Sequence, residues 1–395
     1  MIKILLYGVM PENNFGGPSL MHGAKEIIKE LHDNYEIVFY QSTKPVDIAV
    51  KDMGFKVYQI PYKKTSKFLI DAYKLKLGLR PKSEEHLTFL NNIRNSDIVV
   101  NLYGICFCSN FDSGKNSYFK AIKSTVGKFS VSYVAKIFGV KTAKATASYG
   151  PIISKNDVVA AKFSANHIFD IMYARENESK RQLELVSGRE IPTSPDLANL
   201  MNYDVSKQKG KYIGISISHQ IIRQWKSSET YINCIVKLIE HIISETDYKV
   251  LLIPNEITNG TKYHDVHVAK DILNLLDNLV DVKIVDSKNM TSTQLKNTIS
   301  QCEVLIASRY HACVAALSAG VPTLVIGWHH KYDELLKWYG QNKWILSSEN
   351  CTPEKLISMF DSFLEVQDNE RIVIKENYAN VRSSLLEAGK SMFTI

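Results

Sequence analysis

Hydrophobic and polar positions along the chain predict strands and helices in alternation. The apolar run Ile2–Tyr7 predicts a strand, and apolar residues spaced by three and four between Leu20 and Leu31 predict the helix that follows it. Residues 36–40 predict a second strand. Strand, helix and strand in this order are typical of a parallel α/β layer. We place Pro18 at the first position of the helix, where its missing N–H has no consequence.

The alternation continues along the chain and is interrupted once. Further strands are predicted at 97–100, 142–148 and 171–174, with helices over 156–169 and 178–185. Turn-forming and polar residues predominate from 188 to 210, so we place a domain boundary there. A second series follows, with strands at 212–218, 249–253, 282–285, 303–307 and 321–326. The pattern predicts an α/β fold of two Rossmann-like, doubly wound domains facing a cleft, over residues 1–200 and 201–365.

Length and composition agree with this picture. A chain of 395 residues suggests two domains, and its net charge of +7 permits an anionic substrate without indicating a nucleic-acid partner. The six cysteines are scattered and form no Cys-x-x-Cys motif, so we expect reduced, mostly buried thiols in a cytoplasmic protein. The apolar N-terminal stretch ends at Gly8, too early for a signal peptide, and no apolar run is long enough to span a membrane. The oligomeric state stays open.

The positive charge is concentrated in two stretches of the first domain. Residues 62–82 contain seven basic residues against the single acid Asp71, and residues 115–144 contain seven basic residues and no acid. In the second stretch, apolar residues at helical spacing from Phe119 to Ile137 lie between the lysines. A basic amphipathic stretch of this kind is typical of a peripheral contact with an anionic membrane. The alternative is an ordinary helix with a solvated lysine face.

The strongest functional signal lies in residues 308–323. A buried strand leads to Ser308, which we expect to cap a helix whose first turn carries Arg309 and His311. Gly320 suits the left-handed end of that helix. A helix N-terminus with free N–H groups and an Arg fork suits a phosphate or a carboxylate. The alternative is that Arg309 forms a surface ion pair and His311 is a packed helix residue.

Other candidate residues follow predicted strands at the same edge. The loop 327–334 should overhang the cleft with His329, His330 and Lys331. A polar turn is the alternative, and we expect no metal there because adjacent histidines usually point apart. Arg175 directly follows a predicted strand near the interdomain side, with an exposed salt bridge as the alternative.

Two weaker signals complete the set. The loop after the first strand, with Asn14, Gly16 and Gly17, allows close backbone approach to a ligand, although it matches neither a Gly-x-Gly-x-x-Gly nor a Walker motif. Ser218 occupies the corresponding loop position in the second domain. We interpret residues 264–267, His-Asp-x-His, as a solvated helix face because nothing in the sequence completes a metal site.

These residues together resemble the polysaccharide pyruvyl transferase family over nearly the whole chain, from residues 14–17 to about Tyr339. The most specific part is 308–323, followed by Lys331 and Tyr332. Further matches lie at 147–151, 175–179, 195–196, 214–218 and 252–254, in the same order and spacing. Two features depart from the family: its glycine triplet is replaced by residues 101–104, and the acid of its first loop is absent.

The resemblance implies the two-domain fold of type B glycosyltransferases, with an acceptor side in domain one and a C-terminal helical segment, 366–395, that packs back on it. It implies a pyruvyl transferase that moves the enolpyruvyl group of phosphoenolpyruvate onto two hydroxyls of a saccharide. The product is a pyruvate ketal in cell-envelope polysaccharide biosynthesis, with release of phosphate. Phosphoenolpyruvate is then a co-substrate, and no further cofactor is expected. The acceptor would be lipid-linked if the basic stretches contact the inner face of the membrane.

The family's donor-binding residues correspond to Arg175, Arg309, His311 and Lys331. We expect His311 to be the general acid, because its pKa lies nearest to working pH and bound anions would keep it protonated. The alternative is a nucleotide-sugar-dependent type B glycosyltransferase, against which residues 309–319 lack the acid that commonly holds a ribose. A non-catalytic anion-binding protein is a third possibility.

Overall fold

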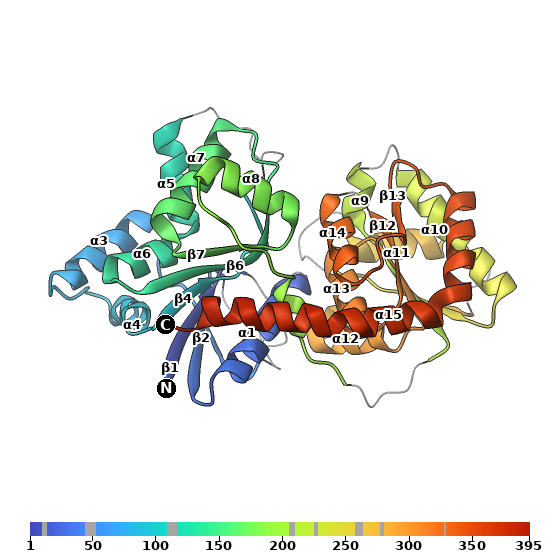
Figure 1. The fold of residues 1–395 in the computed structure, drawn as a ribbon, viewed down its shortest axis with the longest axis horizontal. Helices are drawn as coiled ribbons and strands as arrows, with labels where there is room; N and C mark the ends of the chain where they lie inside the picture. Colours follow the sequence, from blue (N-terminus) through green and yellow to red (C-terminus); the bar gives the residue numbers. More distant parts are fainter. Residues whose placement is uncertain are drawn as a thin grey trace.

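The computed structural model describes residues 1–9, 14–43, 53–108, 117–204, 210–224, 228–256, 264–276, 280–327 and 329–395. Within them the chain forms two all-parallel sheets, each covered by helices (Figure 1). The prediction of two doubly wound α/β domains is confirmed. The strands in the middle of each sheet are almost wholly buried, because helices lie against both faces.

The first sheet has the strand order β3-β2-β1-β4-β6-β5, with β7 paired to β6. Its strands are β1 (Ile2–Tyr7), β2 (Tyr35–Gln41), β3 (Lys56–Gln59), β4 (Ile98–Asn101), β5 (Ile105–Cys106), β6 (Lys141–Tyr149) and β7 (Ile171–Ala174). Its helices are α1 (Gly16–Leu31), α3 (Thr65–Lys76), α4 (Glu84–Arg94), α5 (Tyr118–Lys128), α6 (Ser130–Phe138), α7 (Lys155–Phe163) and α8 (Asn177–Ser187).

The second sheet has the strand order β10-β9-β8-β11-β12-β13. Its strands are β8 (Tyr212–Ser216), β9 (Lys249–Leu252), β10 (Val282–Ile284), β11 (Val304–Ala307), β12 (Thr323–Gly327) and β13 (Ile345–Ser347). Its helices are α9 (His219–Gln224), α10 (Ser228–Glu245), α11 (Asp265–Leu273), α12 (Ser292–Ser300), α13 (Tyr310–Ser318) and α14 (His330–Trp338). In each sheet the strand order reverses beside the first strand, between β1 and β4 and between β8 and β11, the position where such folds bind ligands.

The 41-residue helix α15 (Pro353–Phe393) runs from the second domain across to the first, as the red helix in Figure 1 shows. Near its end, Gly389 lies so close to α1 that a Cβ there would be 2.3 Å from Ile27 Cγ2. Arg382 also pairs with Glu30 of α1. The segment expected at 366–395 is therefore the second part of a helix that begins at Pro353. The division at 200/201 stays a prediction; the two sheets lie on either side of it.

Several local predictions need correction. The helix α1 begins at Gly16, which makes Pro18 its third residue rather than its first. The basic stretch from 115 forms two helices instead of one, because the chain turns at Phe129, whose ring is fully buried; Lys115 itself lies outside the described residues. The helix expected over 156–169 leaves α-geometry after Phe163 and continues as a π-helical turn, η2 (Ser164–Ile168).

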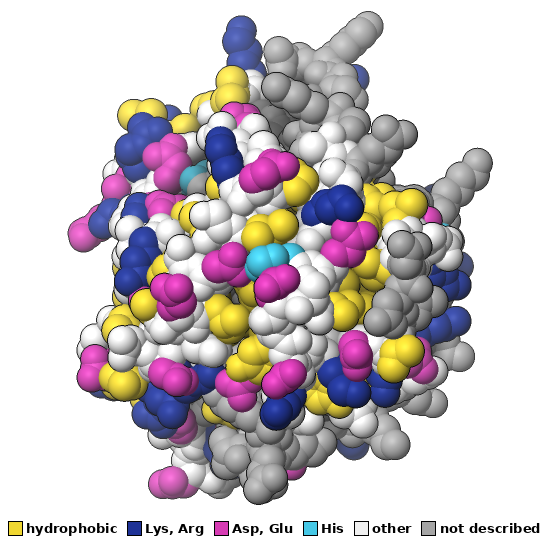
Figure 2. Space-filling model, turned by 90° about the vertical axis from the view of Figure 1, so that its right-hand side faces the viewer, with side chains coloured by type: hydrophobic (Ala, Val, Ile, Leu, Met, Phe, Trp, Pro, Cys, Tyr) yellow, Lys and Arg dark blue, Asp and Glu magenta, His cyan; other side chains and the backbone are white. Residues whose placement is uncertain are grey.

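The remaining features of the fold are the state of the cysteines and the distribution of charge on the surface. All six cysteines are free, and all but Cys108 are buried. Within the described part of the chain, no helix is both long and apolar enough to span a bilayer. On the end of the second domain that points away from the first, acidic and basic side chains lie side by side (Figure 2). The mixed charge there contrasts with the basic stretches of the first domain.

Candidate active site

A cavity of ≈ 230 Å³ lies between the two domains. All four residues expected to bind the donor line it: Arg175, Arg309, His311 and Lys331. The remaining lining comes from both domains and consists of Asn14, Gly16, Gly104, Ile105, Asn255, Glu256, Tyr310 and Tyr332. The fold thus brings together residues that are up to 318 positions apart in the sequence, from Asn14 to Tyr332.

The carboxyl ends of parallel strands explain why these side chains meet. Arg175 is the first residue after β7, and Arg309 follows β11 by two residues. Lys331 stands in the first turn of α14, directly after β12. Because the two sheets present these ends to each other, the three cationic side chains point into one space.

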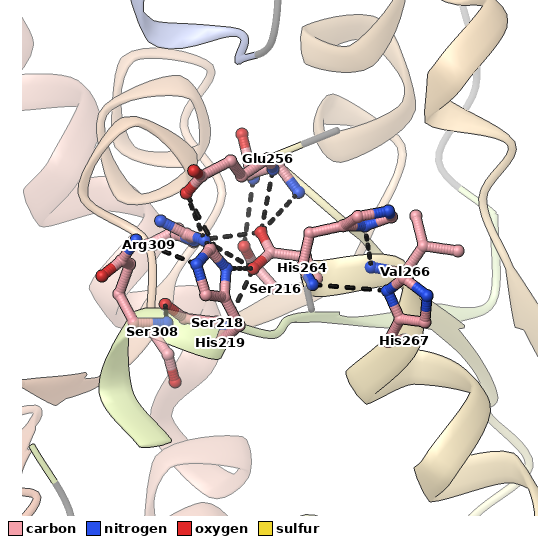
Figure 3. Close-up of polar contacts among 12 residues, drawn as sticks. Ser216, Ser218, His219, Glu256, His264, Val266, His267, Ser308 and Arg309 are labelled. Atoms are coloured by element: carbon pink, nitrogen blue, oxygen red, sulfur yellow. Dashed lines mark hydrogen bonds and ion pairs between the residues drawn. The ribbon is translucent and has the colours of Figure 1, made fainter. Parts of the chain in front are cut away.

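Carboxylates hold the side chain of Arg309, and Figure 3 shows Glu256 as one of them. Its Nε donates to Asp265 Oδ2 over 3.0 Å, and its Nη2 lies 2.8 Å from Glu256 Oε2. The side chain is only 16% exposed, so the alternative of a surface ion pair is wrong. The expected helix start is also wrong: Arg309 itself is the N-cap of α13, with extended backbone, and the hydroxyl of Ser308 accepts a hydrogen bond from Tyr231 instead.

Asp265 is the centre of this network and corrects the interpretation of 264–267 as a solvated face. It is fully buried. One carboxylate oxygen accepts from the backbone N–H of His219 over 2.9 Å, and the other accepts from the N–H groups of Asn255 and Glu256 over 3.1 and 2.8 Å. Burial alone would raise the pKa of this carboxyl, but Arg309 and the hydrogen bonds lower it to about 2. Asp265 is therefore a charged anchor for Arg309.

Arg175 has an equivalent set of partners in the first domain. Its Nε donates to Ser148 Oγ and Glu176 Oε1 over 2.8 and 2.9 Å, and its Nη1 donates to Asp196 Oδ2 over 2.7 Å. Its guanidinium lies 4.2 Å from the ring centroid of Tyr310, a cation–π contact across the domain interface. The side chain is 1% exposed, so the alternative of an exposed salt bridge is wrong.

The carboxylates orient the two guanidiniums without occupying them fully. Asp196, Glu176 and Asp265 do not line the cavity, whereas both arginines do. Nη2 of Arg175 and Nη1 of Arg309 have no hydrogen-bond partner among the described residues. Each arginine therefore keeps a donor for a ligand in the cavity, while its other donors are held by carboxylates, of which Glu256 itself lines the cavity.

Lys331 contributes a third cation from the second domain. It lies in the first turn of α14 rather than in the loop we expected, and its side chain is buried against the ring of Tyr310, with Nζ 5.6 Å from the ring centroid. Burial and the neighbouring Arg175 lower the pKa of Lys331 to about 7. An anion in the cavity would raise that pKa and restore the full charge.

His329 and His330 do not line the cavity. His329 is the N-cap of α14 and accepts from the backbone N–H of Lys331 over 3.3 Å. Burial and the neighbouring His330 lower the pKa of the His329 imidazole to about 4. Among the residues that the structure describes, no group of three His, Cys, Asp or Glu side chains is arranged to hold a metal ion.

His311 stands at the point where the cavity meets a larger one. Its Nε2 lies 3.8 Å from Asp196 Oδ2 and makes no hydrogen bond to any described residue. Burial, together with Arg175 and Lys331, lowers the pKa of His311 to about 4 despite the opposing effect of Asp196. The imidazole is therefore neutral at neutral pH as long as no anion is bound.

Gly16 provides the space for this imidazole. A Cβ built at Gly16 would lie 2.4 Å from His311 Nδ1, so only a glycine fits there. Asn14 fixes the same loop: its side-chain oxygen accepts from the backbone N–H groups of Gly16 and Gly17, and its backbone pairs with Glu256 of the second domain. The backbone N–H groups of Gly16 and Gly17 are thus already hydrogen-bonded to Asn14. Ser218, the other loop residue we singled out, is fully buried outside the cavity lining.

The larger cavity has a volume of ≈ 480 Å³ and belongs to the first domain, except for His311. It shares Asn14, Gly16, Gly104, Ile105 and His311 with the smaller one. Its walls include four tyrosines and two lysines: Tyr7, Tyr40, Tyr62, Tyr103, Lys63 and Lys128. A small polar compartment with three cations therefore opens, past one histidine, into a larger and more aromatic one.

Sequence reasoning assigned no role to four partners of the cations: Asp265, Asp196, Glu176 and Tyr310. For Glu176 and Tyr310, the available signal was their position directly beside a candidate site residue. Asp265 offered a weaker one, because it begins a helix close after the predicted strand at 249–253. The pairing of Asp265 with Arg309 over 44 positions leaves no local trace in the sequence.

Known proteins resemble this chain in sequence and in fold. The sequence model of the family described as polysaccharide pyruvyl transferase matches residues 14–330. No curated protein matches the chain at a significant level. Among solved structures, the fold is similar to that of the UDP-GlcNAc 2-epimerase from Methanocaldococcus jannaschii, with a TM-score of 0.55 and 13% identity over 91% of this chain and 92% of that one.

Two glycosyltransferases are similar to the same degree. One is from Rickettsia africae, with a TM-score of 0.57 and 12% identity over 99% of this chain and 98% of that one. The other is the spinosyn rhamnosyltransferase, solved with thymidine diphosphate, with a TM-score of 0.54 and 7% identity over the full length of both chains. At such identities the similarity establishes the fold alone, which is the two-domain fold of type B glycosyltransferases.

Proposed function

The chain belongs to the polysaccharide pyruvyl transferase family, and from this premise we propose that it transfers the enolpyruvyl group of phosphoenolpyruvate to two hydroxyls of a saccharide. The observation that carries the proposal is the ≈ 230 Å³ cavity into which Arg175, Arg309 and Lys331 converge. Phosphoenolpyruvate carries a phosphate and a carboxylate on three carbons, so its binding site requires several cations in a small space.

The chemistry divides into two additions. The CH2 carbon of phosphoenolpyruvate takes up a proton while the first sugar hydroxyl attacks the neighbouring carbon, which bears the phosphate. The bond from that carbon to the phosphate oxygen then breaks. The second hydroxyl attacks the same carbon and closes the ketal. Of the two hydroxyl protons, one ends in the new methyl group and the other leaves with the phosphate, so the reaction needs no redox partner.

His311 is the residue we assign to the first proton. It is neutral while the site is empty, because burial and the cations beside it lower its pKa to about 4. A phosphate and a carboxylate bound beside the imidazole would raise that pKa and favour the protonated form. After donation to the CH2 carbon, the neutral ring can accept the proton of the attacking hydroxyl, which regenerates the acid. Its position between the two cavities is compatible with both transfers.

The saccharide would then occupy the ≈ 480 Å³ cavity of the first domain. Sugar-sized ligands bind in concave sites that combine aromatic walls with a few polar groups, and this cavity has both. On this proposal the enzyme acts in the cytoplasm, in the synthesis of a cell-envelope polysaccharide.

Ligand-induced stabilisation separates the candidate functions. We expect phosphoenolpyruvate to raise the melting temperature of the protein, since a ligand at a hundred times its Kd adds about 2.7 kcal/mol. UDP-N-acetylglucosamine should have no effect. Stabilisation by the nucleotide sugar alone would favour a glycosyltransferase, and stabilisation by neither would refute the proposal.

Turnover is tested with saccharide acceptors by mass spectrometry, through the gain of pyruvate less one water and the release of phosphate. His311→Ala should abolish both while leaving the melting temperature of the free protein near that of the wild type. His330→Ala is the matched control, because that neighbouring histidine lies outside the cavity. Near-normal turnover of the His311→Ala enzyme would disprove the assigned role.

A further inference from the structure

The outer face of α3 carries apolar side chains exposed to water. Ile70, Tyr73 and Leu77 follow one another at spacings of three and four and are 55%, 49% and 78% exposed. Exposed lysines, Lys67 and Lys74, flank this stripe. The helix itself packs through its opposite side, where Phe68, Asp71, Ala72 and Leu75 are buried. A folded protein gains nothing by exposing such a stripe unless something covers it.

The start of α5 shows the same combination. Tyr118 and Phe119 are 62% and 83% exposed, and the side chains of Lys120 and Lys123 beside them are exposed as well. No acidic residue lies on α5, and the one acid of α3, Asp71, faces inwards and contacts Tyr62 and His86. The outward charge of both helices is therefore entirely positive.

The end of α5 approaches the start of α3 at the larger cavity. A Cβ at Gly127, near the end of α5, would lie 3.6 Å from the hydroxyl of Thr65, the first residue of α3. Both residues line the ≈ 480 Å³ cavity, together with Phe68 of α3 and Lys128 of α5. In Figure 1 both helices lie on the outer side of the first domain, away from the second. Whatever covers this face is thus placed beside the entrance to the cavity.

We propose that this α3–α5 face is a docking surface for an anionic lipid bilayer. We define it by the exposed residues of the two helices: Lys67, Ile70, Tyr73, Lys74, Leu77, Tyr118, Phe119, Lys120 and Lys123. Apolar and aromatic side chains enter the boundary between headgroups and acyl chains, and lysines around them are attracted to anionic headgroups. The absence of outward acids on α3 and α5 supplies the charge complementarity.

The surface also suggests how the acceptor arrives, a point that rests on the proposed function. A saccharide joined to a membrane lipid can enter the larger cavity directly from the bilayer if the mouth of that cavity lies against the headgroups. We therefore infer that the acceptor is lipid-linked. A soluble polyanion fits the observations less well, because it would use the lysines but not the exposed isoleucine, leucine and aromatic side chains.

Vesicle flotation tests the docking surface without any substrate. The full-length protein should bind vesicles of phosphatidylglycerol and phosphatidylcholine at low salt, and should bind vesicles of phosphatidylcholine alone far more weakly. Neutralising Lys67, Lys74 and Lys123 to Gln should weaken binding about five-fold for each lysine. Replacing Ile70, Tyr73 and Leu77 by Ser should weaken it by roughly ten-fold or more.

Matched controls are available on the same chain. Ile372→Ser removes an apolar side chain that is 56% exposed on α15, and Lys270→Gln removes an exposed lysine of α11. Neither should change flotation. Absence of binding by the wild type, or equal losses in the control variants, would overturn the proposal. Loss with the lysine changes but not with the serine changes would also overturn it, since that result indicates a polyanion site.

The result is independent of the proposed reaction. None of the residues changed in α3 and α5 lines either cavity, so stabilisation by phosphoenolpyruvate should persist in all of these variants. If phosphoenolpyruvate fails to stabilise even the wild type while vesicles still bind, the proposed function is wrong and the docking surface stands.

Discussion

Replacing Asp265 tests whether buried carboxylates hold the cations of the site in place. Oδ1 accepts from the backbone and ring of His219 and from Arg309, and Oδ2 accepts from Arg309 and from the N–H groups of Asn255 and Glu256. Both oxygens are therefore pure acceptors facing donors. Asp265→Asn would turn an N–H2 group towards donors in either orientation of the amide, so it should destabilise the protein nearly as much as Asp265→Ala.

The structure sets the size of the effect. Among the described residues, Asp265→Ala leaves Glu256 as the one carboxylate paired with Arg309. Removing one partner of a buried ion pair costs about 3–5 kcal/mol. A second figure for the contribution of Asp265 to stability comes from the pKa of its carboxyl. The pKa of Asp265 falls from 3.8 to about 2 on folding, equivalent to roughly 2 kcal/mol. The second figure is smaller because burial, which raises the pKa of Asp265, offsets part of the stabilisation by Arg309 and the hydrogen bonds.

Thermal and urea unfolding measure this loss. For a domain of this size, 3–5 kcal/mol corresponds to a fall in melting temperature of roughly 10 °C. The control is Asp333→Asn, which breaks an exposed pair with Lys337 and should cost about 0.5 kcal/mol or less. Because the folded pKa lies below the unfolded one, the contribution of Asp265 is full above pH 4 and is lost as the pH falls through 2. A variant as stable as the wild type at pH 7, or a stability difference that does not shrink in acid, would refute the reasoning.

Three further predictions concern the site and the domain contact. Gly16→Ala places a Cβ 2.4 Å from the His311 ring and should lower turnover roughly 100-fold. Gly104→Ala is the control and should lower turnover far less, because its Cβ would meet only contacts of 3.7 Å or more. Equal losses of turnover in the two variants would contradict the reasoning. The pKa of Lys331 is about 7 without ligand, and a bound anion should raise it. The affinity for phosphoenolpyruvate, measured by calorimetry, should therefore fall by up to about ten-fold per pH unit above pH 7. Lys331→Arg, which stays charged, should flatten that slope, and an unchanged slope would disprove the role of Lys331. Gly389→Val should overpack the contact of α15 with α1 and cost about 1–3 kcal/mol in urea unfolding; no loss would show that the contact yields easily.

The alternation of apolar and polar segments was sufficient to predict the fold class. Buried parallel strands are continuous apolar runs, and the helices between them carry apolar residues at spacings of three and four, so both leave local signals in the sequence. The same local logic located Arg175 and Arg309, because a residue directly after such a strand must lie at the carboxyl edge of the sheet. Helix starts were predicted less well: Ser308 and the loop 327–334 were misassigned because capping depends on side-chain contacts that tertiary packing decides.

The sequence by itself therefore determined the two α/β domains, the cationic residues at their facing edges and the basic character of two stretches in the first domain. Only the tertiary structure decided that Asp265 is buried under Arg309, that His329 and His330 lie outside the cavity, and that Lys331 has a pKa of about 7. It also placed the start of α3 and the end of α5 at one cavity. The physical reason is that backbone periodicity is a property of neighbouring residues. Burial, ion pairing and pKa depend instead on which distant segments pack together.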